Sequence, residues 1–122
     1  MNIVIIEQNK IYRESLKVAL NQIYDFNVVC DIENISYPEN ITNVEINLIL
    51  IDCSFGKIVC NEIMNKTLSV WPEVRFLLLA DYKQECNIHK AKSCDIILKN
   101  SSKEEFEIKI RGQQLNEINE LN

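Results

Sequence analysis

Glycine and histidine are scarce in this chain of 122 residues, and their scarcity excludes several kinds of binding site. The two glycines, Gly56 and Gly112, cannot form the three-glycine fingerprint of dinucleotide-binding folds, and neither belongs to a Gly-Lys-Ser/Thr phosphate loop. The single histidine, His89, excludes the two-histidine zinc-protease helix and the two-histidine zinc finger. Nucleotide-binding loops and zinc sites of these kinds are therefore excluded.

The chain also lacks a strong charge of either sign and a long apolar run. Its 13 basic and 18 acidic residues give a net charge of −5, which argues against direct binding of nucleic acid by this domain. The first apolar run stops at Ile6 and no basic segment precedes it, so neither a secretion signal nor a membrane span is expected. We therefore expect a cytoplasmic protein that does not contact the membrane.

The cysteines form an odd set without a Cys-x-x-Cys pair: Cys30, Cys53, Cys60, Cys86 and Cys94. In a reducing compartment they are most simply small buried apolar residues, so no disulfide is expected. A zinc site built from Cys86, His89 and Cys94 has no evident fourth ligand and is a weak alternative.

Short apolar runs of strand length recur along the chain, at residues 2–6, 26–32, 48–51, 75–80 and 95–98. Most of them do not alternate between apolar and polar residues, which is typical of strands buried on both faces of a parallel sheet. With 47% hydrophobic residues, the chain can build the core of one domain spanning residues 1–122.

Segments with helical periodicity separate these runs. Residues 10–24 carry apolar side chains on one face, and residues 57–70 repeat the pattern up to Trp71-Pro72, where the proline disfavours helix. A last helix is predicted to begin at Ser101 or Ser102, because Glu104 or Glu105 completes a capping box. Residues 33–45 and 82–91 are weaker candidates for helices.

This alternation predicts an α/β fold in which a doubly wound five-stranded parallel sheet carries helices on both faces. In such folds the ligand site lies beyond the carboxyl ends of the strands. The residues that follow four of the predicted strands are Glu7 and Gln8, then Asp52, then Ala80 and Asp81, and finally Lys99. The sequence thus predicts a cluster of carboxylates, an amide and an ammonium group at one edge of the sheet.

Four segments resemble the receiver domain of two-component response regulators, and their sequences are most similar to the NarL/LuxR type: VIIEQNKIYRE, NLILIDCSFGK, WPEVRFLLLA and CDIILKNSSKEEFEIKIRG. The resemblance extends over residues 1 to about 112 and implies a flavodoxin-like (βα)5 fold with strand order 2-1-3-4-5. It implies a signalling domain and not an enzyme. A sensor histidine kinase or another signalling protein would be its partner, and a helix-turn-helix output domain would follow it.

Under this resemblance, Asp52 matches the carboxylate that accepts a phosphoryl group from a kinase phosphohistidine, and Lys99 matches the lysine that pairs with a phosphoryl oxygen. The family holds Mg²⁺ with two acids after the first strand together with the phosphoacceptor, because this ion prefers charged oxygen ligands. Glu7, Gln8 and Asp52 occupy these positions here.

Several departures from the family pattern are expected to weaken this chemistry. Gln8 lacks the charge of the family acid and Glu7 is one methylene longer than the usual Asp, so Mg²⁺ affinity should fall. Ala80 replaces the Ser or Thr that contacts the phosphoryl group, and Ile96 replaces the aromatic residue that moves with that hydroxyl. Gly56 replaces a proline, a smaller change. We therefore expect a degenerate receiver, with a working phosphorylation switch at Asp52 as the alternative.

Other interpretations remain at this stage. A flavin carrier on the same kind of sheet is unattractive, since residues 7–11 offer no hydroxyl- and glycine-rich phosphate loop. The absence of Lys and Arg between Lys17 and Lys57 marks either a face for a basic partner or a solvated acidic surface. Residues 113–122 form a linker helix toward an output domain, a homodimer contact or a frayed end.

Overall fold

The computed structural model describes residues 1–33, 44–82 and 94–121, and for residues 113–121 only the backbone is described. A sheet of five parallel strands has the order β2-β1-β3-β4-β5, which is the predicted order. The strands are β1 (Asn2–Ile6), β2 (Asn27–Ile32), β3 (Leu48–Asp52), β4 (Arg75–Ala80) and β5 (Cys94–Leu98). Their carboxyl ends therefore meet at one edge of the sheet.

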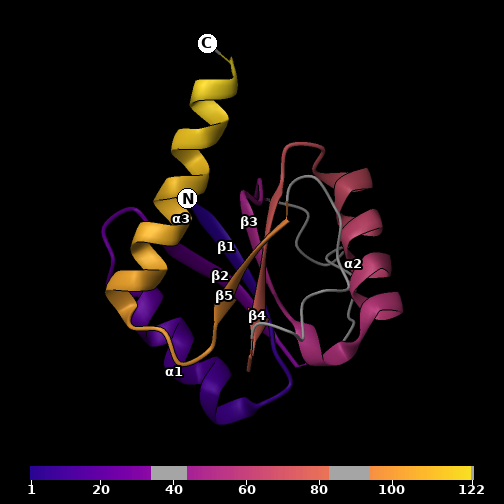
Figure 1. The fold of residues 1–122 in the computed structure, drawn as a ribbon, viewed down its shortest axis with the longest axis vertical. Coiled ribbons are helices and arrows are strands. Elements are labelled where there is room, and N and C mark those ends of the chain that lie inside the picture. Colours follow the sequence, from indigo (N-terminus) through magenta and orange to yellow (C-terminus); the bar gives the residue numbers. More distant parts are fainter. Residues whose placement is uncertain (34–43, 83–93, 122) are drawn as a thin grey trace.

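Helices cover both faces of this sheet, as Figure 1 shows. Helices α1 (Lys10–Asn21) and α3 (Lys103–Leu121) lie on one face, and α2 (Lys57–Val70) lies on the other. A turn of 3-10 helix, η2 (Cys53–Phe55), connects β3 to α2. In β3, Leu48 and Leu50 pack toward α1 and α3, whereas Ile49 and Ile51 pack toward α2. Burial on both faces explains why the strand sequences do not alternate.

The helix boundaries show which local signals were informative. Ser102 caps α3 through the predicted capping box, since Glu105 N donates to Ser102 Oγ at 3.1 Å and Ser102 N donates to Glu105 Oε1 at 3.0 Å. Helix α1 ends at Asn21 and not at residue 24 as predicted. The chain instead turns toward β2, with Asp25 in the left-handed region at φ 64°.

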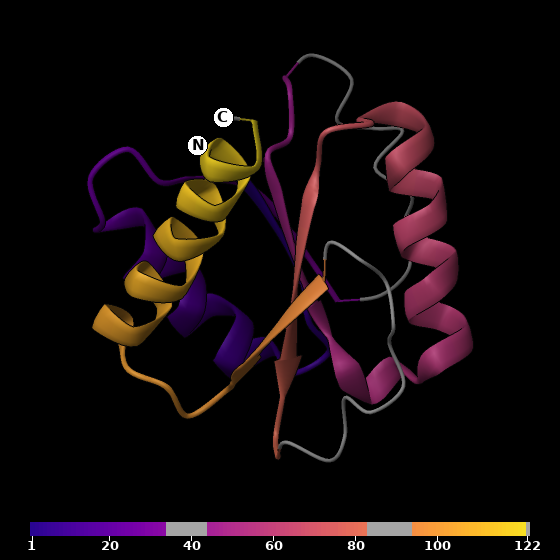
Figure 2. The same ribbon diagram turned by 45° about the horizontal axis from the view of Figure 1, so that its top comes forward.

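The C-terminal helix runs continuously to Leu121, and its far end extends beyond the strands in Figure 1. Figure 2 shows it on the same side of the sheet as α1 and opposite α2. Its attachment lies in its first turns, where Phe106 and Ile110 are 2% and 1% exposed in the core. The three proposed roles for residues 113–122 stay predictions. None of the helices in the described part of the chain is long and apolar enough to span a membrane.

The prediction that no disulfide forms is wrong at one position. Cys30, Cys60 and Cys94 form no disulfide, but Cys53 is disulfide-bonded. An odd number of cysteines without a Cys-x-x-Cys pair says nothing about which of them the fold brings together. The weak helices at 33–45 and 82–91 fall largely outside the described residues, as do Cys86 and His89 of the zinc alternative.

Candidate functional site

The pleat of the sheet directs three charged side chains to the same face. In β1, β3 and β5 the residues Ile6, Ile51 and Leu98 pack toward α2. Each is followed by a charged residue at the strand end, and the charged residues are Glu7, Asp52 and Lys99. Because side chains alternate along a strand, all three point toward the face covered by α1 and α3.

These three side chains form a compact ionic cluster. Lys99 Nζ lies 2.8 Å from Glu7 Oε1 and 3.0 Å from Asp52 Oδ1. The carboxyl groups of Glu7 and Asp52 are 0% and 1% exposed, while the Lys99 side chain is 14% exposed. The structure thus brings together Asp52, Lys99 and Glu7 from strand ends far apart in the sequence, with the ammonium group bridging two buried carboxylates.

Hydrogen bonds from neighbouring residues also engage the oxygens of both carboxylates. Asn9 N donates to Glu7 Oε2 at 2.8 Å. Ser54 N donates to Asp52 Oδ1 at 2.9 Å, and Ser54 Oγ donates to Asp52 Oδ2 at 2.8 Å. Gln8 Nε2 donates to Ser54 Oγ at 2.8 Å, so the amide of Gln8 reaches Asp52 only through the serine. Both carboxylates are therefore held in place by their neighbours.

The pKa values of the two carboxyl groups are shifted in opposite directions. Burial raises the pKa of Glu7 above its ordinary value, although Lys99 and the Asn9 N–H oppose this shift. Burial also acts to raise the pKa of Asp52, but the hydrogen bonds from the Ser54 backbone and Lys99 outweigh it and lower the pKa. For Lys99, ion pairing with Glu7 and Asp52 outweighs burial and raises the pKa. The contacts at the site therefore favour the charged forms of Asp52 and Lys99.

The raised pKa of Glu7 predicts a specific pH dependence of stability. A carboxyl group whose pKa is higher in the folded state binds more protons there than in the unfolded chain. Its contribution is full below the unfolded pKa of 4.5 and is lost as the pH rises through the folded value. We expect the unfolding free energy of Glu7→Gln minus that of the wild type to increase as the pH rises from 4.5, measured by urea denaturation. A difference that does not change with pH would contradict this.

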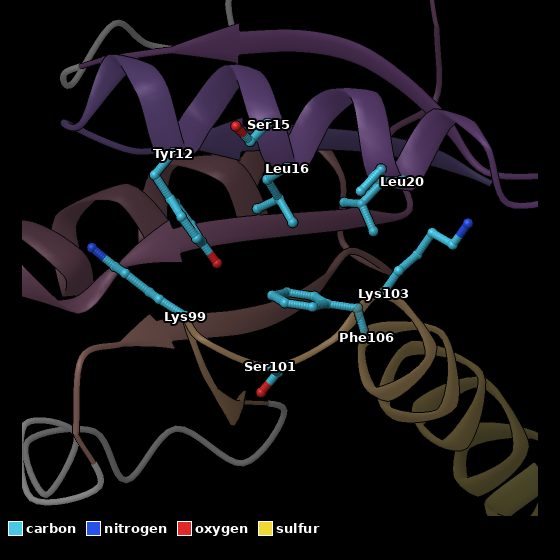
Figure 3. A pocket seen from close by; sticks show the side chains of 9 residues that line it. Tyr12, Ser15, Leu16, Leu20, Lys99, Ser101, Lys103 and Phe106 are labelled. Atoms are coloured by element: carbon cyan, nitrogen blue, oxygen red, sulfur yellow. The ribbon is translucent and has the colours of Figure 1, made fainter.

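Tyr12 of α1 lies beside the cluster. Its ring centroid is 5.7 Å from Lys99 Nζ, and its buried hydroxyl has no hydrogen-bond partner among the described residues. Figure 3 shows this side chain beside a cavity of about 170 Å³ between α1 and the start of α3, where Leu16, Leu20 and Phe106 form an apolar wall. Burial raises the pKa of Tyr12, so the ring stays neutral next to the ammonium group.

Ala80 and Ile96, which replace the family's switch residues, pack on the opposite face of the sheet from the ionic cluster. Ala80 is fully buried at the end of β4, and Ile96 of β5 is partly buried. Both pack into the apolar cluster on the α2 face. Neither side chain provides a hydroxyl or an aromatic edge, and their roles stay predictions.

The sequence interpretation missed Ser54, Asn9 and Tyr12 as members of the site. A hydroxyl two residues after an aspartate is a recognisable signal, because a Ser side chain and backbone N–H at that spacing commonly bond to the Asp carboxylate. The amide N–H of Asn9 and the ring of Tyr12 gave no such signal, since their positions depend on where α1 begins.

The residues predicted to hold Mg²⁺ do not fit a metal site in their present arrangement. Glu7 directs its two oxygens at Lys99 and Asn9, and Gln8 presents its NH₂ group, which cannot ligate a cation, to Ser54. Within the described ranges no group of three or more His, Cys, Asp or Glu side chains is placed to hold a metal ion. A weakened Mg²⁺ site formed by Glu7, Gln8 and Asp52 stays a prediction.

Several solved structures with a similar fold are response regulators. A response regulator from Thermotoga maritima superposes with a TM-score of 0.70 and 19% identity over 92% of this chain and 95% of that chain. RcsB from Salmonella typhimurium gives 0.72 and 16% over 95% of this chain and 60% of that one. A chain in the complex of the P1 domain of CheA3 with CheY6 from R. sphaeroides gives 0.74 and 17% over 93% and 96%.

No model of a known protein family matches the sequence, and no curated protein sequence matches it either. The identities of 16–19% with the three response-regulator structures show the fold alone. The chain therefore has the fold of a response-regulator receiver domain, with the strand order expected from the sequence.

Proposed function

We propose that this chain is a receiver-like signalling domain in which Lys99 takes over charge compensation that a metal ion provides in the family it resembles. The observation that supports this most directly is the bridge from Lys99 Nζ to Glu7 Oε1 and Asp52 Oδ1, at 2.8 Å and 3.0 Å. Phosphorylation of Asp52 is then weak or absent, and the domain regulates transcription through protein contacts.

The charges of the site support this proposal. Gln8 is neutral where the family has an acid, so the described cluster holds two carboxylates and one ammonium group. Burial raises the pKa of Glu7, so the site disfavours a second full negative charge beside Asp52. A divalent cation gains most where several carboxylates repel one another, and here Lys99 already relieves that repulsion.

The proposed partners rest on analogy with structures of similar fold. One such structure is RcsB from Salmonella enterica bound to promoter rprA in the presence of the phosphomimetic BeF₃⁻, and another contains CheA3 P1 with CheY6. We propose that this domain likewise contacts a sensor histidine kinase or another signalling protein. An output domain that binds DNA would follow α3, whose far end points away from the sheet (Figure 1).

One observation favours the alternative, a working phosphorylation switch. Asp52 and Lys99 are already in contact, so the ammonium group is placed to neutralise an oxygen of a phosphoryl group on Asp52. In that reaction an Asp52 oxygen attacks phosphorus, a new O–P bond forms, and the bond to the donor breaks with its electron pair leaving on the donor.

A phosphodonor assay separates the two proposals. We expect incubation with acetyl phosphate to label the wild type weakly, and Mg²⁺ to change that labelling little, because the site lacks a suitable ligand set. Intact-mass spectrometry measures the acyl phosphate, and Asp52→Asn is the control that must not be labelled. Rapid labelling that requires Mg²⁺ and changes the conformation would instead establish the switch.

A further inference from the structure

We propose that Ser54, supported by Gln8, is a positioning residue that restrains Asp52 and slows its attack on phosphorus. This inference rests on the proposed function, because it treats Asp52 as the phosphoacceptor position. It is carried by a chain of two hydrogen bonds, each 2.8 Å long, from Gln8 Nε2 to Ser54 Oγ and from Ser54 Oγ to Asp52 Oδ2.

The donors determine the direction of these two hydrogen bonds. The amide nitrogen of Gln8 can only donate, so Ser54 Oγ accepts that bond and its single proton remains for Asp52. The carboxylate can only accept, which matches the hydroxyl that points at Oδ2. Gln8 therefore orients the Ser54 hydroxyl toward the carboxylate.

Both oxygens of Asp52 are engaged as a result. Oδ1 accepts from Ser54 N and contacts Lys99 Nζ, while Oδ2 accepts from Ser54 Oγ. An oxygen that attacks phosphorus must offer a lone pair and must turn toward the donor. Oδ1 therefore has two donors on it and can attack only if Lys99 or the backbone moves. Oδ2 keeps a second lone pair, but the bond from the Ser54 hydroxyl lowers its nucleophilicity and restrains its rotation, so attack through Oδ2 is slowed while that bond persists.

The local backbone keeps Ser54 in this position. Asp52 caps the 3-10 turn η2, in which Ser54 is the middle residue, and the bond from Ser54 N to Asp52 Oδ1 belongs to that cap. Gln8 and Ser54 are both exposed, in contrast to Asp52, which is 1% exposed. The hydroxyl can therefore be removed from the surface of the site without opening the core.

Two nearly isosteric variants test the proposal. Ser54→Thr keeps the hydroxyl and adds a methyl group, and Ser54→Val has a second methyl group in place of that hydroxyl while leaving the backbone N–H. With acetyl phosphate and Mg²⁺, we expect Ser54→Val to form the Asp52 acyl phosphate about tenfold faster than the wild type, the size of effect typical of a hydrogen bond to a charged group. Ser54→Thr should label at about the wild-type rate, within about twofold.

The initial rate is followed by intact-mass spectrometry, and circular dichroism establishes that each variant is folded. Gln8→Ala, which removes the donor that orients Ser54, should also label faster than the wild type. If Ser54→Val labels no faster than Ser54→Thr, the restraint by Ser54 is overturned, whatever the absolute rate.

A further variant tests the proposed function separately from the restraint by Ser54. Gln8→Asp combined with Ala80→Thr restores the residue types of the resembled family at these two positions. Labelling of this variant at Asp52, with equal rates for Ser54→Val and Ser54→Thr, would show receiver chemistry without the restraint. Absence of labelling in the restored variant and in both Ser54 variants would overturn the restraint and would also count against a receiver-type site.

Discussion

Replacement of Lys99 by methionine is expected to lower the free energy of unfolding by about 3 kcal/mol at neutral pH, because removal of one partner of a buried ion pair leaves charge without compensation. Glu7 and Asp52 are 0% and 1% exposed, and Lys99 is within 3.0 Å of both. Methionine preserves the apolar stem that packs near Tyr12 and removes the charge. Urea denaturation at pH 7 measures the loss.

Lys109→Met is the matched control. Lys109 also forms an ion pair, with Asp95 at 3.2 Å, but its side chain is 40% exposed, so its loss should cost less than about 1 kcal/mol. Adding Asp52→Asn to the Lys99→Met variant should recover part of the stability, since the uncompensated charge is then removed. Equal losses for the Lys99 and Lys109 variants would show that the cluster does not stabilise the fold.

Replacement of Phe106 by alanine is expected to cost about 3 kcal/mol of unfolding free energy, as is typical when a buried aromatic side chain is truncated. Phe106 is 2% exposed and joins α3 to the core that α1 and the sheet form. It also lines the cavity next to Leu16 and Leu20 (Figure 3), so its truncation enlarges that cavity. Thermal and urea unfolding measure the effect.

Ile108→Ala tests whether burial, and not apolar character, causes this loss. Ile108 lies two residues further along α3 but is 73% exposed. Its replacement should change the unfolding free energy by less than about 0.5 kcal/mol. If the two variants lose similar stability, α3 is not attached through Phe106, and the packing described for its first turns is wrong.

Much of the architecture could be predicted from the sequence, because buried parallel strands have a distinctive composition. The apolar run 48–51 corresponds to β3 within one residue, and residues 57–70 match α2. The capping box at Ser102 is a local interaction between neighbouring residues, so its signal does not depend on the rest of the fold. The apolar periodicity predicted the end of α1 three residues too late. The helix ends earlier because the chain must turn at Asp25 to enter β2.

The candidate site was predictable in part for the same reason. Parallel strands bring their carboxyl ends to one edge, so Glu7, Asp52 and Lys99 could be expected near one another from their positions after strands. The sequence could not predict which carboxylate oxygens the Lys99 ammonium group contacts. The bond from Gln8 to Ser54 joins two segments that meet only in the folded chain, and no signal in the sequence indicated the disulfide at Cys53.

The sequence by itself determined the order of strands and helices and the residues available at the strand ends, because local periodicity and capping depend on neighbours in the chain. Only the tertiary structure decided that Lys99 bridges Glu7 and Asp52, and that Ser54 holds the second oxygen of Asp52. Those contacts join residues up to 92 positions apart, from Glu7 to Lys99, and such pairs are set by the register of the sheet and the burial of its ends.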